Sequence, residues 1–550
     1  MSQGENREGS ASKAASSGVY QFAYARSRDQ DAAEPVRHPI VIVGAGPVGL
    51  SLAIDLAQRG RKVVLLDDAD RIGEGSRAIC FSKRSLEVWD RLGVGDRMLA
   101  KGVEWKVGKV FLGDGLVYGF DLLPEDGNKR PAFINLQQFY AEKYLVERVA
   151  QLPAIDLRWR NKVTGLDRGN DGVTITVETP EGSYRLGAHY LVACDGARSQ
   201  LRALVGAEFV GETFEDQFLI ADVKMQAEFP TERWFWFDTP FHSGQSALLH
   251  RQPDDVWRID LQLGPDADPK EETRPERVRP RIERMLGHGD FTFEWISLYR
   301  FQCRRMKRFL HGRVIFAGDS AHQVSPFGAR GANSGLEDGE NLAWKLDLVL
   351  GGKADDALLE SYDLERTQAA DDNIGHSTRS TDFIAPHSAF ERQLRNTTLR
   401  LAGKAEFAKR MVNAGRLSTP TVYDTPLSTP DTEAWSGRAR PGTAMIDARL
   451  EDANGQAHFL TELFHRAGCR FTLLTYGVAD AETLAPDLDL ARIAIGPRGY
   501  TDTTGAFAER WGAEPGSAYL LRPDGYVAAR IKAPTPARVA AAHRRACACA

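Results

Sequence analysis

The chain has 550 residues, of which 42% are hydrophobic and 26% charged, and its formal net charge at pH 7 is −5. This length suffices for roughly three ordinary domains, and the acidic balance offers no basic face to a phosphate backbone, so we expect no nucleic-acid partner. No apolar run approaches the ~20 residues that cross a bilayer, and residues 1–38 lack the apolar stretch of a secretory signal, so we expect a cytoplasmic enzyme without membrane contact.

The first 38 residues are expected to form a flexible arm. Residues 1–19 are rich in Ser, Gly, Ala and charged residues, a composition that buries too little apolar surface to become ordered. Tyr20, Phe22 and Tyr24 alternate with smaller residues and are candidates to pin the end of the arm to the folded body.

A glycine-rich turn between two apolar runs dominates the next segment. The run at 39–43 leads into Gly44-Ala45-Gly46-Pro47-Val48-Gly49, a helix is expected as far as Gly60, and Asp67 follows the second run at 63–66. The first glycine permits a tight turn, the second admits a pyrophosphate to the backbone N–H groups, and the third lets the helix approach the sheet. Asp67, 18 residues after Gly49, can accept hydrogen bonds from a ribose. The pattern predicts a dinucleotide site, and the alternative is a glycine turn in an unrelated α/β fold.

The following segments are expected to continue an α/β domain. The predicted elements are helices at 85–92 and 136–152 and strands at 163–166, 173–178, 184–186 and 190–194. The last of these strands is apolar throughout and ends in Asp195-Gly196.

Polar and apolar residues alternate between about 215 and 303, for example at 233–237, 246–250 and 256–263. This alternation predicts an antiparallel sheet with one covered face. Four tryptophans fall in the stretch, at positions 234, 236, 257 and 295. We favour packing in the core or on the sheet face for them, and the alternative is the lining of a pocket for a flat aromatic ligand.

The α/β pattern then returns, so the first domain is expected to be discontinuous. A strand at 313–317 ends in Gly318-Asp319, and Ser334 with Glu337 predicts a capping box for a helix that runs to Gly351. The predicted organisation is an arm at 1–38, a dinucleotide domain at 39–105, 136–214 and 304–414, an antiparallel domain at 106–135 and 215–303, a linker at 415–440, a second α/β domain at 441–535 and a frayed tail at 536–550. The six cysteines are scattered, and we expect neither a disulfide framework nor a metal site.

Three motifs follow strands or begin a helix. Asp195-Gly196-Ala197-Arg198-Ser199 and Gly318-Asp319-Ser320-Ala321-His322 each follow a predicted strand, and the segment 325–333 leads into a helix. An acid at the end of a parallel strand lies at the ligand-binding edge of the sheet. A helix N-terminus offers free N–H groups to a ring carbonyl or a developing anion. Singly, each motif could be an ordinary turn or cap, but together with the glycine turn they predict one binding edge.

In this order the motifs resemble those of the single-component FAD-dependent aromatic hydroxylases of the para-hydroxybenzoate hydroxylase class. The runs from Gly318 to Leu346 and from Leu521 to Ala528 look like the branch of 3-(3-hydroxyphenyl)propionate hydroxylase and phenol hydroxylase. The resemblance spans roughly residues 39–535. It implies an α/β fold with a Rossmann-like FAD-binding domain, interrupted by a mostly antiparallel substrate domain and followed by a thioredoxin-like domain.

The resemblance also implies roles for matching positions. The ADP half of FAD would be held by Gly44, Gly46, Pro47, Gly49 and Asp67, the pyrophosphate and ribityl region by Arg77, Gln138, Gly318 and Asp319, and the isoalloxazine ring by Pro326, Gly331, Ala332 and Asn333. Gln137 is the alternative to Gln138. Asp195 and Arg198 belong to a motif implicated in both FAD and NAD(P)H binding.

The implied activity is hydroxylation of a phenolic ring by O2 and NADH or NADPH through a flavin C4a-hydroperoxide. The protein would stabilise anionic reduced flavin, activate the phenol as phenolate and exclude water. Pro326 and His322 are the candidate catalytic residues, although a structural role for His322 is equally expected. His250 and Tyr299 are weaker candidates for the phenol base. An alkyl- or carboxyl-bearing phenol is the first choice of substrate, and a larger polycyclic phenol is the second.

Other functions on the same fold remain open. A flavin halogenase is disfavoured because the run 234–238 is not followed by Ile-Pro. A non-oxygenating FAD reductase or oxidase and a silent flavin-binding scaffold are further alternatives. The resemblance implies a mobile flavin that meets NAD(P)H at the surface. Because residues 441–534 contain Cys469 but no CxxC, we expect the thioredoxin-like domain to be redox-inert and to serve packing or the assembly of a homodimer.

Overall fold

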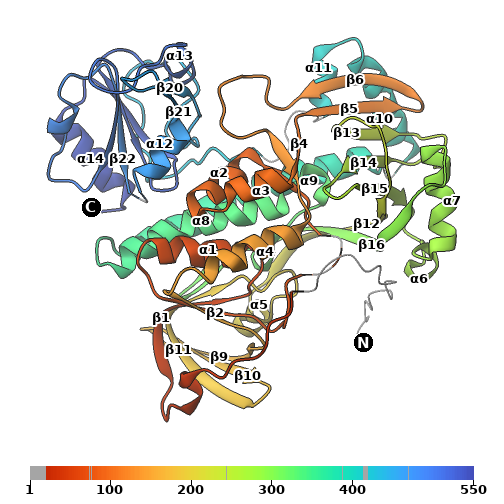
Figure 1. Ribbon diagram of the computed structural model, residues 1–550, viewed down its shortest axis with the longest axis horizontal. Coiled ribbons are helices and arrows are strands. Elements are labelled where there is room, and N and C mark those ends of the chain that lie inside the picture. The colour runs from red at the N-terminus through yellow and green to blue at the C-terminus, as the bar shows by residue number, and fades with distance from the viewer. Residues whose placement is uncertain are drawn as a thin grey trace.

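Long helices cross the centre of the molecule and are bordered by three sheets (Figure 1). The computed structural model describes residues 20–549 apart from positions 74, 76, 243, 387, 413–418 and 469. In this view a parallel sheet lies at the bottom, an antiparallel sheet at the right and a smaller C-terminal sheet at the upper left. Within the described ranges we find no helix whose length and apolar content would let it traverse a bilayer.

The arm is built into the fold from residue 20 onward, whereas residues 1–19, predicted to be disordered, lie outside the described residues. The ring of Phe22 stacks on Trp159 with centroids 4.4 Å apart, which confirms that this ring pins the arm. Ser27 caps a short 3-10 helix, η1 (Arg28–Asp31). The prediction of a flexible arm up to residue 38 is therefore wrong for its second half, because these local contacts fix the chain before β1.

The parallel sheet has the order β17-β18-β11-β1-β2-β8, and β10 and β9 extend it from β11. The five strands from β18 to β8 run parallel. Their bounds are β1 (Val36–Val43), β2 (Val63–Leu66), β8 (Ile155–Arg158), β9 (Lys162–Arg168), β10 (Val173–Thr179), β11 (Gly182–Ala193), β17 (Leu310–His311) and β18 (Val314–Phe316). Ile40, Leu65, Val192 and Ile315 are fully buried, as expected for a covered parallel sheet.

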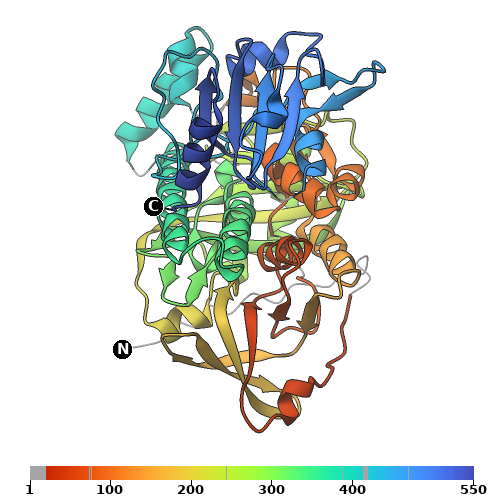
Figure 2. The same cartoon turned by 90° about the vertical axis from the view of Figure 1, so that its left-hand side faces the viewer.

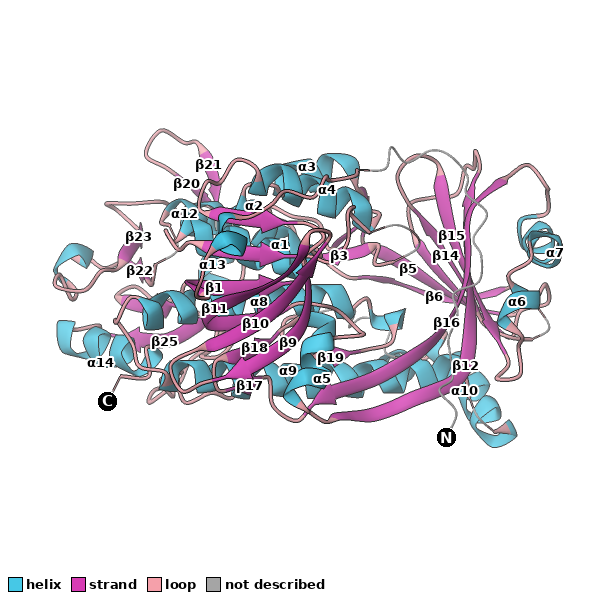
Figure 3. Cartoon of the chain, turned by 90° about the horizontal axis from the view of Figure 1, so that it is seen from below, coloured by secondary structure: helices cyan, strands magenta, loops and turns pink. Residues whose placement is uncertain are grey.

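Helices from distant parts of the chain pack beside this sheet (Figure 3). They are α1 (Pro47–Gln58), α2 (Lys83–Leu92), α3 (Gly95–Lys101), α4 (Gln138–Val149), α5 (Gln200–Val205), α8 (Gly331–Leu350) and α9 (Ala357–Ile384). The helices predicted near 85–92 and 136–152 are confirmed as α2 and α4. A Cβ on Gly335 would lie 2.7 Å from a methyl carbon of Val48, so this glycine lets α8 lie close against α1.

The predicted capping box of α8 is wrong. The helix begins at Gly331, three residues before Ser334, and no side chain within the described ranges caps it. The backbone oxygen and Oγ of Ser334 instead accept hydrogen bonds of 3.0 and 2.9 Å from the buried Arg366 of α9, and Glu337 lies 3.5 Å from the same guanidinium. A partner about thirty residues away thus overrides the local capping signal.

The antiparallel sheet has the order β19-β16-β12-β15-β14-β13-β5-β6, and only β13 and β5 pair in parallel. The predicted antiparallel character is confirmed. Its elements are β5 (Val107–Leu112), β6 (Gly115–Asp121), β12 (Phe209–Lys224), β13 (Arg233–Phe237), β14 (Ala247–Arg251), β15 (Val256–Leu263), β16 (Thr292–Met306) and β19 (His322–Gln323), with α6 (Pro269–Glu272) and α7 (Pro275–Leu286) on one side. A small sheet of β3 (Cys80–Ser82), β7 (Phe133–Asn135) and β4 (Val103–Trp105) adjoins it.

The two faces of the antiparallel sheet differ. The outer face packs Trp257, Val278 and Ile282 into a core, against which Trp234 and Trp236 also pack, as predicted for these tryptophans. Trp295 lies on the other face, where a Cβ on Gly75 would meet its ring at 2.7 Å.

The C-terminal unit has a sheet of order β23-β22-β24-β25, in which only β22 and β23 are parallel. Its elements are β20 (Arg449–Glu451), β21 (Ala457–Phe459), α12 (Leu460–Arg466), β22 (Thr472–Tyr476), β23 (Ala491–Ile495), α13 (Ala506–Trp511), β24 (Ser517–Leu521), β25 (Val527–Lys532) and α14 (Pro536–Ala546), and α10 (Ala389–Ala402) and α11 (Glu406–Met411) precede it. The predicted frayed tail is wrong, because Thr535 caps α14 and Val539, Ala542 and Ala546 bury one face of it.

The C-terminal unit, blue in Figure 2, lies next to the green helices α8 and α9. The turn between β24 and β25 docks it there. Arg522 donates hydrogen bonds of 2.7 and 3.0 Å to Glu365, whose carboxylate also accepts one from Lys345 at 2.8 Å. Trp344 Nε1 donates to Asp524 at 3.0 Å. All five of these side chains are buried, so the C-terminal unit is held by a buried polar network.

Candidate functional site

The turn between β1 and α1 is shaped by its three glycines. Gly44 has φ +107°, and a Cβ there would lie 2.2 Å from the backbone oxygen of Cys194. A Cβ on Gly49 would lie 1.9 Å from the oxygen of Gly44, whereas one on Gly46 would meet no atom of the described residues within 4 Å. Among the residues that the structure describes, no side chain caps α1. The first and third glycines therefore close the turn, and the second leaves open space in front of a helix N-terminus, as an anionic ligand requires.

Asp67 at the end of β2 turns toward the same glycine turn. Its Oδ2 accepts a hydrogen bond of 2.6 Å from the N–H of Ala45, and its Oδ1 accepts one of 2.9 Å from Ala69. Burial raises the pKa of Asp67, and the charge of Arg77 acts in the opposite sense. The carboxylate thus positions the turn, and each oxygen keeps a further lone pair for the ribose role that stays a prediction.

Gln138 and Glu142, one turn apart on α4, hold the segment that carries Arg77. Gln138 Oε1 accepts from the N–H of Ala78 at 3.3 Å, and its amide donates to Glu142 at 2.7 Å. Glu142 also accepts from the N–H of Gly73 at 2.5 Å. The amide of Gln137 points elsewhere, to the oxygen of Pro253. Glu142 is a positioning residue that the sequence analysis missed, because nothing local marks it.

The two strand-end acids lie at the same edge, after β11 and β18. Asp195 Oδ2 accepts from the N–H of Leu201 at 3.1 Å, while its buried Oδ1 has no hydrogen-bond partner among the described residues. Asp319 is exposed although Gly318 and Ser320 beside it are buried. Arg198 is also exposed. The edge therefore presents two carboxylates with unused acceptor capacity.

The N-terminus of α8 completes this edge. Pro326 is exposed between the buried Ser325 and Phe327, and Gly331 is only half-buried. The ring of Phe327 packs on Phe218 of the antiparallel sheet, with centroids 4.6 Å apart. The loop thus brings an uncapped helix N-terminus to the boundary between the parallel and antiparallel sheets.

Comparison with known proteins identifies the group to which the chain belongs. A family model described as an FAD binding domain matches residues 37–377, which is more than half of the chain. The chain belongs to this FAD-binding family.

Named relatives of this FAD-binding protein are oxygenases. The chain is 30% identical over 510 residues to the 12-dehydrotetracycline 5-monooxygenase/anhydrotetracycline 6-monooxygenase of Streptomyces rimosus, covering 90% of this chain and 95% of the relative. It is 27% identical over 519 residues to a 3-(3-hydroxy-phenyl)propionate/3-hydroxycinnamic acid hydroxylase of Escherichia coli, covering 89% and 91%. The solved OxyS anhydrotetracycline hydroxylase from Streptomyces rimosus matches with a TM-score of 0.70 and 26% identity over 93% of this chain and 99% of that structure. The flavin-dependent monooxygenase PieE shares the fold, with a TM-score of 0.80 at 24% identity over 94% of this chain and all of that structure.

The open space in front of Gly46 and the unpartnered Oδ1 of Asp195 fit an FAD laid along this edge. The roles predicted for Asn333 and His322 do not match their contacts.

Asn333 is buried: its Oδ1 accepts a hydrogen bond from the N–H of Ser82 at 2.9 Å, and its amide donates one to the oxygen of Cys80 at 3.0 Å. It therefore joins α8 to β3, and its side chain is not available to a ring.

His322 does not fit the catalytic role predicted for it. It is fully buried, and its Nε2 lies 2.7 Å from Oδ2 of Asp338. The same oxygen accepts from the N–H of Gly318 at 2.8 Å. The imidazole has no surface left for a ligand, so the structural alternative for His322 is the correct one: it braces the Gly318 turn.

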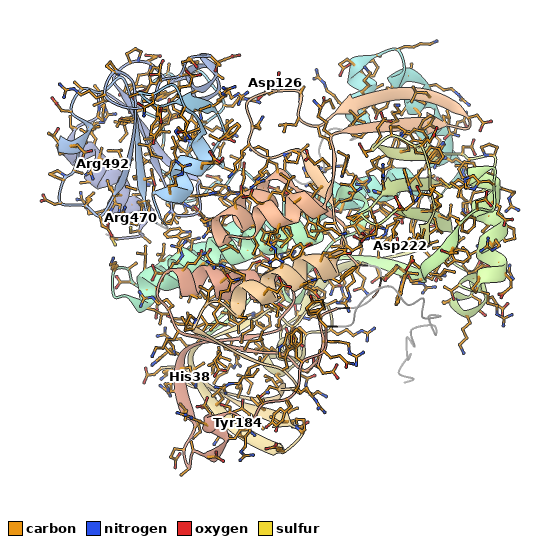
Figure 4. The ribbon with its side chains drawn as sticks, in the orientation of Figure 1. His38, Asp126, Tyr184, Asp222, Arg470 and Arg492 are labelled. Atoms are coloured by element: carbon orange, nitrogen blue, oxygen red, sulfur yellow. The ribbon has the colours of Figure 1, made fainter. Side chains whose placement is uncertain are left out.

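A group of charged side chains on the antiparallel sheet was not predicted. Strand register places Asp222, Arg233, His250, Arg258 and Asp260 on one face, which we call the inner face. Asp222, labelled in Figure 4, lies where the antiparallel sheet meets the rest of the molecule. The sequence could not reveal the group, because its members come from four strands and meet only through pairing.

Two of these five residues form a closed pair. Arg258 donates hydrogen bonds of 2.8 and 3.0 Å to Asp222 and a third, also 2.8 Å, to the backbone oxygen of Arg77. The inner face therefore fixes the backbone at Arg77, next to the predicted FAD edge.

Proposed function

We propose that this protein is an FAD-dependent aromatic monooxygenase that uses NADH or NADPH and O2 to hydroxylate a phenolic ring. The observation that carries the proposal is the convergence of the glycine turn, Asp195, Asp319 and the uncapped N-terminus of α8 at one edge, beside the antiparallel sheet on which Phe327 packs. These four features would hold the cofactor, and the inner face of the antiparallel sheet would receive the substrate.

Bound FAD, once reduced by the nicotinamide, would supply the activated oxygen. The first turn of α8 would stabilise negative charge on the cofactor ring through its free N–H groups and its helix dipole. The loop at Pro326 and the packed ring of Phe327 would exclude water from the reacting atoms. The inner face would orient the phenol and take its proton.

For the substrate we propose an alkyl- or carboxyl-bearing phenol, in line with the hydroxyphenylpropionate hydroxylases among the relatives. A polycyclic phenol is the second candidate, and the identity of 30% to the tetracycline monooxygenase favours it.

The C-terminal unit is proposed to be a redox-inert thioredoxin-like domain, and its strand order with one parallel and two antiparallel pairs supports this.

We also propose a homodimer. Exposed apolar side chains on α10 and α11, namely Phe390, Leu394, Phe407 and Met411, are consistent with a contact between copies. Sedimentation of the purified protein over a range of concentrations tests the dimer.

The experiment that tests the function uses the purified protein loaded with FAD. We expect the flavin to remain bound through gel filtration, and a phenol to stimulate NAD(P)H oxidation with formation of a hydroxylated product. The panel should contain 3-(3-hydroxyphenyl)propionate, 4-nitrophenol and anhydrotetracycline. H2O2 as the sole product with every phenol would favour the oxidase alternative, and failure to retain FAD would contradict the proposal.

A further inference from the structure

Arg233 is a buried cation with unused hydrogen-bonding capacity. Only 3% of its surface is exposed, and its Nε and Nη1 have no hydrogen-bond partner in the part of the chain that the structure describes. Within that part no carboxylate oxygen lies within 4 Å of it, unlike Arg258, which is paired with Asp222. Its guanidinium instead lies over the ring of Phe235, 4.8 Å from the centroid. An unpaired buried guanidinium is costly unless a ligand anion completes it.

Asp260 is the acidic counterpart on the same face. Asp260 is 8% exposed, and its Oδ1 is buried without a hydrogen-bond partner among the described residues. Its Oδ2 lies 3.9 Å from Nε2 of His250, too far for a hydrogen bond. Burial raises the pKa of Asp260 from its ordinary 3.8 to about 6, although Arg258 and Arg233 act in the opposite sense. An open carboxylate of this kind is suited to accept a proton near neutral pH.

His250 does not compete for that role. Burial and the charges of Arg233 and Arg258 lower its pKa well below 6.5, so the ring is neutral near pH 7. Its Nδ1 lies 3.9 Å from the Sγ of Cys80. The remaining charged side chains that face Asp260 are Arg258 and Asp222, which bind each other.

The group lies close to the predicted position of the flavin ring. Asn333, in the first turn of α8, donates to the backbone oxygen of Cys80, and the thiol of that cysteine faces His250. The ring of Phe218, on the inner face, packs against the ring of Phe327, which is next to Pro326 in the chain. A cavity of about 270 Å³ lies farther along the same face, where Gln262 lines it together with Gln245 and Arg395; Arg233 and Asp260 do not line it. A small aromatic ring bound on the inner face would therefore be adjacent to the N-terminus of α8.

We propose that Arg233 and Asp260 form the binding site for the substrate's phenolic hydroxyl, with Asp260 accepting the phenolic proton and Arg233 holding the phenolate. The O–H bond of the phenol breaks, its proton passes to Oδ1 of Asp260, and the electron pair stays on the phenolate oxygen beside the guanidinium. This inference rests on the proposed function. It narrows the substrate to aromatics with a free hydroxyl and excludes their methyl ethers.

Binding of 4-nitrophenol to the FAD-loaded protein tests the role of Arg233 without turnover, because ionisation of this probe changes its visible absorption. We expect the wild-type protein to bind 4-nitrophenol more tightly than 4-nitroanisole and to lower the pH at which the bound probe ionises. Arg233→Gln should weaken binding of the phenol by roughly ten- to a hundred-fold and abolish the preference over the ether. Arg233→Lys should keep part of the wild-type affinity for the phenol and part of the preference over the ether.

The matched control is Arg251→Gln, which removes an arginine from β14 beside His250 but on the opposite face. It should bind both probes as the wild type does. Retained flavin absorbance reports folding of each variant. If Arg233→Gln matches the wild type in affinity and in the ionisation of the probe, the inference is wrong.

The role of Asp260 is tested by a pH profile. Hydroxylation by the wild type should rise with pH through about 6, as Asp260 loses its proton. Asp260→Asn should lower kcat by roughly a hundred-fold and remove that limb, with KM changed much less. An unchanged acidic limb in this variant would overturn the assignment. If no phenol of the panel binds the wild-type FAD-loaded protein, the proposed function itself is wrong. If the wild type binds a phenol but the variants behave as the wild type does, only the assignment of Arg233 and Asp260 is wrong.

Discussion

At the scale of single residues, the inner face contains a carboxylate that the fold alone does not need. Asp260 is buried, and its Oδ1 lacks a hydrogen-bond partner within the described residues. Functional sites commonly retain such groups at a cost in stability, which a substitution then relieves. The residue therefore offers a test in which stability and activity should change in opposite directions.

We predict that Asp260→Asn raises the free energy of unfolding while lowering hydroxylation activity. Because burial raises the folded-state pKa from 3.8 to about 6, the ionised carboxylate disfavours folding increasingly as pH rises between these values, and the effect is constant above them. The gain in free energy of unfolding should be about 3 kcal/mol at pH 8 and about half of that at pH 5. Thermal melts of both proteins at the two pH values measure it. A variant that melts lower than the wild type at pH 8 would show that the carboxylate is a structural group.

At the scale of elements, the site depends on where two helices begin. The start of α1 was predictable, because a glycine turn after an apolar strand has a local cause in the backbone. The start of α8 was predicted four residues too late, because Ser334, expected to be its N-cap, instead accepts hydrogen bonds from Arg366 of another helix. Local signals therefore define a helix terminus only where no distant partner intervenes.

The glycines before α1 allow a matched pair of substitutions. Gly46→Ala should fold normally, since a Cβ there meets nothing within 4 Å, but it should weaken FAD binding by about ten-fold or more because the methyl group occupies the space of the pyrophosphate. Gly49→Ala should instead impair folding, since its Cβ would lie 1.9 Å from the oxygen of Gly44. Fluorescence titration with FAD and a thermal melt separate the two effects. Normal FAD affinity in a folded Gly46→Ala protein would place the cofactor elsewhere.

At the scale of the whole molecule, the C-terminal unit and the α/β core share a buried charge network. Glu365 is the central carboxylate: burial opposes its ionisation, but Arg522 and Lys345 outweigh burial and lower its pKa. The stabilisation from a lowered carboxyl pKa is present above the ordinary value of 4.5 and is lost as the pH falls below it. The two parts should therefore stay docked across the neutral range.

Removing one partner should undock the C-terminal unit. Arg522→Met leaves Glu365 and Asp524 buried without their shared cation, and we expect a loss of roughly 3–5 kcal/mol. Limited proteolysis should then release the unit, whose first strand is β20, while FAD absorbance is retained. The double variant Arg522→Met with Glu365→Gln should recover part of the loss. Equal protease resistance of wild type and Arg522→Met would contradict the docking role.

The sequence predicted the α/β core, the antiparallel sheet and the edge formed by the glycine turn, Asp195 and Asp319, because parallel strands end together and each motif is local. It did not reveal Arg233 and Asp260 as partners, since only the register of β13, β14 and β15 places them on one face. It also missed α14, whose apolar positions need the C-terminal sheet to cover them. The cofactor motifs were thus predictable because each is local in the sequence. The proposed substrate residues Arg233 and Asp260 were not, because strand pairing between distant segments brings them together.

The most direct test of the account is the fate of isotopically labelled O2 in a reaction of the FAD-loaded protein with NAD(P)H and a phenol that stimulates it. We predict that mass spectrometry will find one labelled oxygen atom in the hydroxylated aromatic product and that Asp260→Asn will divert most of the oxygen to H2O2. An unlabelled aromatic recovered alongside labelled H2O2 in the wild-type reaction would contradict the assignment as a monooxygenase.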